Sequence, residues 1–357
     1  MKQYAYAFYC MKAPRVLMMN QRAGPAIPEP ARSKGEETQM KQFAMAASLI
    51  ALAATGATAE EVTLKGVTAF AGGTTFSRPF EAFVERVNET GKGVVQINYV
   101  GGPEAVPTFE LGNAVSNGIV DIANNTTAFY TNLLPTGDAL HLATNTIQDQ
   151  RANGCYDKID ALHQDQMNVK YLARTGDHIQ FHLYLTKPID TTDLSGLTIR
   201  VTPVYRAMFE KLGATLVRTA PGEVYTALER GAIDGYGWPV QGVMDLGWDE
   251  QTKYRVDPGF YQVDVNFLVN LDKWNELSDE AKKVLEDAAE WTEARSAENL
   301  SINEAEAAKQ AEAGIEVIAF DADTSKSWLD TAQTAGWDAV AAIDEKIAAD
   351  LKPCLTE

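Results

Sequence analysis

From Glu61 onward, hydrophobic and polar residues alternate between two periods along the chain. Short runs of β-branched or apolar residues, typical of strands, are separated by segments in which apolar residues recur at helical spacing. The strand-like runs are VTLKGVTAF, VVQINYV and IVDIA, and the helix-like segments between them are PFEAFVERVNE and FELGNAVSNG. This order of elements predicts an α/β fold.

Two segments of this pattern resemble each other, NAVSNGIVDI at 113–122 and TALERGAIDG at 226–235. In each, a glycine (Gly118 or Gly231) can close a helix in the left-handed conformation before a short strand begins. Many α/β proteins contain such a joint, so the repeat supports two similar lobes only weakly.

Residues 277–314 carry the pattern of one long helix. Ser278 is suited to cap its start, and Asp279 and Glu280 would lie in the first turn, where negative charge is favourable. The segment is rich in Ala, Glu and Lys, which favour helix. A helix of this length exceeds the width of one lobe, so we expect it to brace both.

The N-terminal part of the chain has the pattern of an export signal. Residues 40–59 combine a lysine, an apolar run over 43–54 and a small-residue end at Ala57 to Ala59, which is typical of a secretory signal peptide. Residues 1–39, polar and Pro-rich, are expected to be a leader from a misplaced start codon or an extended leader. The apolar run is too short to span a bilayer, and no later stretch approaches the ~20 apolar residues that a membrane helix needs.

The net charge of the chain limits the classes of partner that it can bind. The net charge is −18 over 357 residues, and without residues 1–59 there remain 24 Lys and Arg against 46 Asp and Glu, a net charge of −22. Such an acidic surface repels phosphate backbones and anionic membranes. We therefore expect no nucleic-acid partner and no direct membrane insertion.

Three cysteines are present, and Cys10 would be lost with the leader. Cys155 and Cys354 would then lie in an oxidising compartment, where a disulfide can persist. The spacing leaves a bridge and two separate thiols equally open.

The sequence contains none of the common enzyme motifs: no Gly-x-Ser-x-Gly, no His-Glu-x-x-His, no Walker loop and no Cys-x-x-Cys. Of the four histidines, His178 and His182 stand four positions apart, but they share a strand-like stretch, so they do not form the helical pair of a metal site. We therefore expect neither an enzyme nor a metal or other cofactor.

The most informative stretch is 196–239, which follows the order strand, helix, strand, helix, strand. In its first strand, Ile199 and Val201 flank Arg200, so the guanidinium leaves on the opposite face from these core side chains. A guanidinium at such a place can pair bidentately with a ligand carboxylate, or it can form an ordinary salt bridge between lobes.

Several segments together resemble the solute-binding proteins of TRAP (tripartite ATP-independent periplasmic) transporters, of the DctP type. The resemblance covers nearly all of residues 60–351, and the segments that carry it are AGGTTFSRPFEAFVERVNETGKG, NAVSNGIVDIA, GLTIRV, YRAMFEKLGAT, GEVYTALERGAIDG and LSDEAKKVLEDAA. It implies a two-lobed α/β fold with crossing strands, a long bracing helix and a ligand cleft between the lobes. It also implies that Arg200 holds the carboxylate of a small organic acid, which is delivered from the periplasm to integral membrane TRAP carrier subunits.

The resemblance also implies a division of the chain. Lobe I would comprise residues 60–184 with part of 266–312, and lobe II would comprise residues 185–265 with part of 313–357.

The chain departs from the family pattern at two cleft positions. Phe181 stands where many members carry a second arginine, and Trp238 stands where many carry a polar amide. Tyr236 and Trp238 are two apart in a strand, so their rings project to the same side, either as an aromatic wall or as core packing. One strong cation beside aromatic rings favours a monocarboxylate with an aromatic or apolar body, ahead of a four-carbon dicarboxylate and a sugar acid.

Further polar contacts could come from the carboxyl ends of strands, where open α/β sheets bind ligands. The candidates are Thr74, Thr75, Asn124, Asn125 and His182. Two other functions remain open at this stage: a sensor subunit that presents its closed form to a membrane kinase, and a periplasmic enzyme on the same frame.

Overall fold

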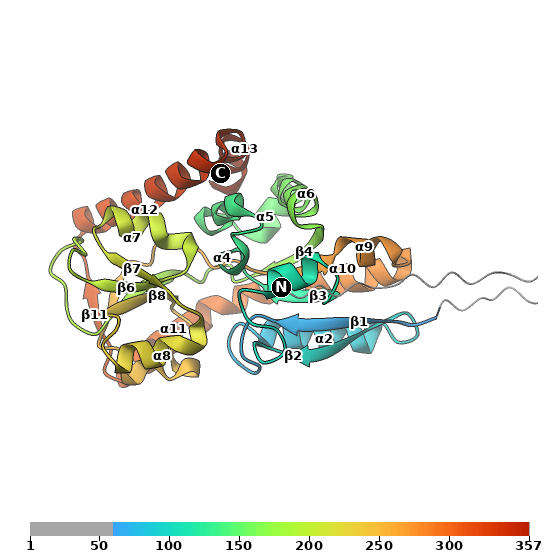
Figure 1. Cartoon of the computed structure of the whole chain (residues 1–357), viewed down its shortest axis with the longest axis horizontal. Coiled ribbons are helices and arrows are strands. Elements are labelled where there is room, and N and C mark those ends of the chain that lie inside the picture. The colour runs from blue at the N-terminus through green and yellow to red at the C-terminus, as the bar shows by residue number, and fades with distance from the viewer. Residues whose placement is uncertain (1–59, 357) are drawn as a thin grey trace, which may run out of the picture. The chain divides into compact units, whose positions relative to one another are not determined.

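The computed structural model describes residues 60–356, so the predicted leader (1–39) and signal peptide (40–59) lie outside the described residues. The described residues belong to one compact unit. This unit contains two β-sheets with helices packed against them, so the predicted α/β fold is confirmed (Figure 1).

The first sheet has five strands in the order β2-β1-β3-β10-β4, and we call the part around it lobe I. β1 is parallel to β2 and β3, whereas β10 is antiparallel to β3 and β4. The strands are β1 (Val62–Thr68), β2 (Val95–Gly101), β3 (Ile122–Asn125), β4 (Val169–Thr175) and β10 (Val265–Asn270).

The second sheet has six strands in the order β11-β9-β5-β8-β6-β7, and we call the part around it lobe II. The strands are β5 (Phe181–Leu185), β6 (Thr198–Val201), β7 (Thr215–Arg218), β8 (Gly235–Pro239), β9 (Tyr254–Asp257) and β11 (Glu316–Ala319). The expected boundary between residues 184 and 185 falls inside β5. Because β5 pairs with β8 and β9, Phe181 and His182 belong to lobe II.

In the described residues, three connections join the sheets: β4 of lobe I leads into β5 of lobe II, β9 of lobe II leads into β10 of lobe I, and the helical segment after β10 leads into β11 of lobe II. The helices of lobe I bury apolar faces against its sheet, as α2 does with Phe80, Phe83, Val84 and Val87. The α-helices before β10 are α2 (Arg78–Thr90), α3 (Leu111–Ser116), α4 (Thr127–Tyr130), α5 (Ile147–Ala152), α6 (Cys155–Met167), α7 (Arg206–Lys211) and α8 (Pro221–Glu229). The 3-10 helices there are η1 (Pro135–Leu142), η2 (Pro203–Tyr205), η3 (Met244–Leu246) and η4 (Trp248–Glu250).

The prediction of a single helix over 277–314 is wrong, because the helical segment is interrupted. After α9 (Leu271–Glu276), the chain forms α10 (Asp279–Ala294), a 3-10 turn η5 (Arg295–Glu298) and α11 (Asn299–Glu312) (Figure 1). Ser278 caps α10 as expected by accepting a hydrogen bond from the backbone N–H of Ala281. Near its end, the Thr292 hydroxyl donates to the carbonyl of Ala288, a bond that tends to bend helices.

The two halves of this helical segment contact different lobes. α10 packs on α2 and β4 of lobe I. In α11, Gln310 donates a hydrogen bond to the carbonyl of Val240 at 2.7 Å and accepts one from Arg255, both in lobe II. The segment therefore braces both lobes although it is not one continuous helix.

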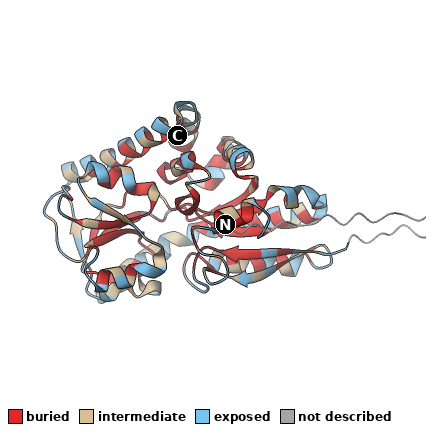
Figure 2. Cartoon of the chain, in the orientation of Figure 1, coloured by how far each residue is buried: buried red, intermediate tan, exposed pale blue. Residues whose placement is uncertain are grey.

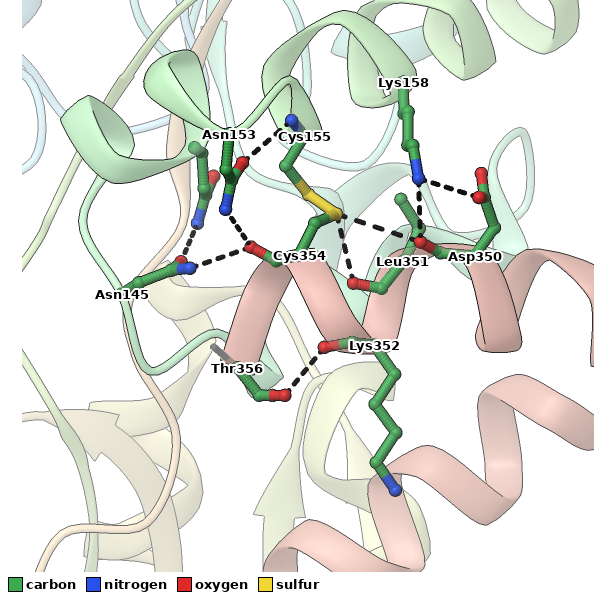
Figure 3. The surroundings of a disulfide bond; sticks show 10 residues. Asn145, Asn153, Cys155, Lys158, Asp350, Leu351, Lys352, Cys354 and Thr356 are labelled. Carbon is green, nitrogen blue, oxygen red and sulfur yellow. Dashed lines mark hydrogen bonds and ion pairs between the residues drawn. A yellow bond between two sulfur atoms is a disulfide. The ribbon is translucent and has the colours of Figure 1, made fainter.

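The chain ends in two helices, α12 (Ala322–Ile343) and α13 (Glu345–Thr356), whose outer faces are exposed (Figure 2). A disulfide joins Cys155 at the start of α6 to Cys354 in α13, so the bridge that the sequence left open is present (Figure 3). The carbonyl of Cys354 also accepts hydrogen bonds from the side-chain amides of Asn145 and Asn153. These contacts fix the C-terminal helix to lobe I.

Over residues 60–356, none of the helices combines the length and the apolar character that crossing a membrane requires.

Candidate functional site

Residues from both lobes enclose a small inner cavity of about 30 Å³. Its walls are mainly aromatic: Phe70, Phe76 and Phe129 come from lobe I, and Phe181 and Trp238 come from lobe II. The other lining residues are Thr126, Ala128, Thr202, Tyr205, Pro239, Val263 and Val265. The last two lie on the connection from β9 to β10 and at its end, so the cavity borders a crossing segment between the lobes.

A larger outer chamber of about 370 Å³ adjoins the inner cavity, and both are lined by Phe70, Phe76 and Trp238. This volume falls within the usual range for small-molecule sites. The remaining lining residues are Ala69, Ala71, Thr74, Thr75, Pro103, Glu104, Pro107, Thr108, Ala220, Pro221, Gly222, Gly242, Asp245 and Leu246. We call the inner cavity and the outer chamber together the cleft.

Arg200 lies in β6 with its side chain fully buried. Its Nε and Nη2 donate to the carbonyl of Thr219 at 3.1 and 2.7 Å, and its Nη1 donates to the hydroxyl of Tyr205 at 3.3 Å. Its Cζ lies 5.7 Å from the centre of the Trp238 ring, within cation–π range. Arg200 itself lines neither part of the cleft. Its guanidinium lies behind Tyr205 of the inner cavity and Trp238, which lines both parts, and beside Thr219.

Within residues 60–356, no Asp or Glu forms a salt bridge with Arg200, so the expected alternative of an interlobe ion pair is not formed. Burial without a carboxylate lowers the pKa of this guanidinium from its usual value. Because the three hydrogen bonds use three of its five N–H donors, two donors remain for an anion. This arrangement suits a carboxylate ligand.

Buried polar atoms around the cleft also have no hydrogen-bond partner in the described residues. They include Oγ1 of Thr202, which lines the inner cavity, Nε1 of Trp238, and Oγ1 of Thr219. Thr202 follows Arg200 by two residues in extended backbone, so both side chains project to the same side. Since a buried unpaired polar atom is costly, these atoms favour a polar ligand.

Four of the residues expected from the sequence line the cleft. Phe181 lines the inner cavity, Trp238 lines both parts, and Thr74 and Thr75 line the outer chamber. The donors of Thr75 are already engaged, because its backbone N–H and its hydroxyl both donate to Asp245 of lobe II, at 2.6 and 2.7 Å.

The aromatic wall expected from Tyr236 and Trp238 is formed only in part. Both rings contact Trp248 on the same side of the sheet, as their spacing predicts. Tyr236, however, is fully buried, stacks on Tyr184 and hydrogen-bonds Thr252, so it packs the core of lobe II and lines neither part of the cleft.

His182 lies away from the cleft. Its Nδ1 pairs with Asp257 at 2.9 Å, and its ring borders a separate surface hollow beside α11. Burial alone would raise the pKa of Asp257, but hydrogen bonds from His182 and Arg255 outweigh it and lower this pKa to about 2.

Asn124 and Asn125 are fully buried at the carboxyl end of β3 and line neither part of the cleft. Asn124 donates to Thr68 and to the carbonyl of Phe76, which itself lines the cleft. One atom of each asparagine, Oδ1 of Asn124 and Nδ2 of Asn125, has no partner in the described residues. Asn124 therefore contacts the lining of the cleft through the backbone carbonyl of Phe76.

Sequence reasoning missed most of the aromatic lining and two polar groups. Tyr205 and Thr202 stand within five residues of Arg200 in RVTPVY, a signal that proximity alone could have provided. Phe70 and Phe76 flank the predicted turn that carries Thr74 and Thr75. Asp245 had no sequence signal, because its role depends on a contact with lobe I across 170 positions. No group of three or more His, Cys, Asp or Glu in the described residues is placed to hold a metal ion.

A protein family and an individual relative both match this chain. The sequence profile of the family described as bacterial extracellular solute-binding protein, family 7, matches residues 68–342. The monocarboxylate 2-oxoacid-binding periplasmic protein of Nostoc sp. (strain PCC 7120) is 28% identical over 223 residues, 58% of this chain and 60% of that protein. The chain thus matches less than two thirds of this relative's length.

Solved structures share the fold. A TRAP transporter solute-binding protein of Bordetella bronchiseptica RB50, with copurified calcium and picolinate in its active site, superposes with a TM-score of 0.72 and 22% identity, over 83% of this chain and 92% of that one. A Bordetella pertussis extracytoplasmic solute receptor that binds pyroglutamic acid gives 0.74 and 18%, over 82% and 99%. These matches confirm the two-lobed solute-binding fold.

Proposed function

Because the chain belongs to the bacterial extracellular solute-binding proteins of family 7, a family of receptors and not of enzymes, we propose that it captures a small organic monocarboxylate in the periplasm. The favoured ligand has an aromatic or apolar body. Its carboxylate pairs with Arg200, and the two lobes close over it. The loaded protein then delivers the acid to integral membrane TRAP carrier subunits.

The observation that carries this proposal is the buried guanidinium of Arg200, which has no carboxylate partner in the described residues. A buried cation is costly unless it is paired. A ligand carboxylate that reached its two remaining donors would supply the missing charge. The position also suits a ligand, because Arg200 lies near the carboxyl end of a strand that is parallel to both of its neighbours.

The aromatic walls support an apolar or aromatic body over a strongly polar one. The rings of Phe70, Phe76, Phe129 and Phe181 can cover both faces of a small ring or chain. The ligands named for the relatives, 2-oxoacids, picolinate and pyroglutamate, are all carboxylates and agree with this class.

The sizes of the two spaces support lobe closure. The inner cavity of about 30 Å³ is far smaller than a usual small-molecule site, so an acid that pairs with Arg200 would enter while the lobes are further apart. Closure then brings lobe I rings such as Phe76 onto Trp238, whose ring centres lie 6.0 Å apart. The ligand would thereby shift the equilibrium towards the closed form.

The test is a thermal-unfolding screen of the purified protein against aliphatic, aromatic and sugar acids, with the corresponding neutral amides as controls. A ligand at about 100 times its Kd stabilises the folded state by ~2.7 kcal/mol, which raises the melting temperature by several degrees. We expect the shift with apolar or aromatic monocarboxylates and not with their amides. Shifts with no carboxylate, or equally with the amides, would contradict the proposal.

A further inference from the structure

The ionisable side chains that line the outer chamber of the cleft are acidic. Among the described residues that line it, the only ionisable side chains of either sign are Glu104, in the loop after β2, and Asp245, in η3. They come from different lobes, and none of the described Lys or Arg residues lines the chamber. The guanidinium of Arg200 lies behind the chamber wall, 5.7 Å from the ring of Trp238, whereas the two carboxylates line the chamber itself.

Both carboxylates are held in place by hydrogen bonds from the backbone. Asp245 accepts from the backbone N–H and hydroxyl of Thr75, and Arg78 reaches it at 3.2 Å from outside the chamber. Glu104 accepts from the N–H of Gly102 at 2.7 Å, and this bond lowers the pKa of its carboxyl group. These hydrogen bonds fix the positions of both carboxylates at the chamber.

A hydrogen-bond donor faces the same chamber. Nε1 of Trp238 has no partner among the described residues, and the whole side chain is only 5% exposed. A Cβ placed on Gly242 would lie 3.3 Å from this Nε1 and 3.7 Å from Cβ of Thr75, and Gly242 and Thr75 both line the outer chamber. Because an indole N–H can only donate a hydrogen bond, a ligand would have to supply an acceptor for it.

We infer that the outer chamber selects the far end of the ligand: Trp238 Nε1 donates to an uncharged acceptor there, while Asp245 and Glu104 repel a second carboxylate. The selected class is thus a monocarboxylate that carries a neutral oxygen or nitrogen acceptor on its body, such as a carbonyl, a hydroxyl or a ring nitrogen. This inference rests on the proposed function and specifies the ligand of the same site. It places four-carbon dicarboxylates outside the preferred class, because specificity can come from repulsion as well as from attraction.

The test compares acids that share one body and differ only at the far end. The aliphatic series is butanoate, succinamate and succinate, and the aromatic series is benzoate, isophthalic acid monoamide and isophthalate. Calorimetry on the wild-type protein should rank each amide acid above its dicarboxylate. In Asp245→Asn, the affinity for the dicarboxylate relative to the amide acid should rise about tenfold, since one of two repelling charges is removed while an acceptor for Thr75 remains.

The readout is the ratio of the affinity for the dicarboxylate to the affinity for the amide acid. Asp245 also bonds to Thr75 and Arg78 of the other lobe, so its replacement can lower the affinity for all ligands together. Asp330→Asn is the matched control: Asp330 pairs with Lys326 on the exposed side of α12 and should leave every ratio unchanged. Glu104→Gln provides a second variant in the chamber. Trp238→Phe should reduce the advantage of the amide acid over butanoate or benzoate about five- to tenfold.

A wild-type preference for the dicarboxylates, or ratios within twofold of wild type in both Asp245→Asn and Glu104→Gln, would overturn the repulsion. An unchanged amide preference in Trp238→Phe would overturn the role of the indole N–H. In each of these cases the acids still bind, so the proposed function stands. If no acid of any length or shape binds the wild-type protein, the proposed function fails and the inference fails with it.

Discussion

Replacing Arg200 by methionine should strongly weaken binding of the acid while leaving the ligand-free fold intact. Methionine keeps most of the length and apolar stem of arginine but removes the charge and all five donors. Truncating one partner of a buried, hydrogen-bonded charge pair costs about 2 to 5 kcal/mol of binding free energy. The Kd should therefore rise by about 30-fold to several thousandfold.

The stability of the ligand-free protein should change little, which separates a binding role from a structural one. The substitution removes a fully buried cation that has no carboxylate partner in residues 60–356, and this is favourable. Against this, the carbonyl of Thr219 loses its two donors, which costs about 1 to 3 kcal/mol. Tyr205 keeps the carbonyl of Gly237 as a partner at 2.7 Å. The two opposing effects leave the free energy of unfolding within about 2 kcal/mol of wild type.

The assay is calorimetric titration with the acid that gives the largest thermal shift, together with urea unfolding without ligand. Arg200→Lys should bind with intermediate affinity, because lysine keeps the charge but not the planar fork. Arg206→Met is the matched control, since Arg206 lies on the exposed side of α7 and pairs with Glu210. Wild-type affinity in Arg200→Met, or a loss of more than about 4 kcal/mol in its ligand-free stability, would refute the reasoning.

Three further predictions test the surroundings of the site and the frame. Thr202→Val should lower the affinity for the acid about five- to tenfold in calorimetry without destabilising the ligand-free protein, because the lost hydroxyl has no partner in the described residues; unchanged affinity would contradict a ligand contact. Reducing the disulfide, or Cys354→Ser, should cost about 2 to 5 kcal/mol in urea unfolding, because the bridge closes a loop of 199 positions; equal stability of the oxidised and reduced protein would contradict it. Burial raises the pKa of Asp138 to about 7. The unfolded chain therefore loses this proton near pH 4, but the folded protein loses it only near pH 7, so the free energy of unfolding of the wild type should fall between these pH values. Asp138→Asn should not show this part of the loss, so its stability relative to wild type should rise between pH 4 and 7; a pH-independent difference would contradict the shifted pKa.

Local patterns in the sequence predicted the parts of the fold that depend on neighbouring residues. The alternation of Ile199, Arg200 and Val201 placed the arginine correctly on the opposite face from its neighbours, and Ser278 capped α10 as expected. The break between α10 and α11 was missed, because the hydroxyl of Thr292 bonds back to its own helix while overall composition still favours helix. Propensity describes single residues and does not include such a bond.

The depth of a side chain was harder to predict than its direction. Spacing showed that Tyr236 and Trp238 share a side, yet only Trp238 reaches the cleft, since Tyr236 lies further back along β8 against Tyr184. In the same way, Phe181 and His182 are neighbours in β5, but one lines the inner cavity and the other pairs with Asp257. Periodicity gives the face of a sheet, whereas the packing of the other lobe decides which part of that face borders a cavity.

The sequence predicted only the face of the strand on which the guanidinium of Arg200 lies, whereas the structure also buries it completely. This difference strengthens the functional argument, because an exposed arginine would gain little from a carboxylate in water. A buried guanidinium without a carboxylate carries a desolvation cost in the ligand-free protein. Pairing with a ligand removes this cost at the place where the aromatic rings of the two lobes exclude water, so closure and carboxylate binding should favour each other.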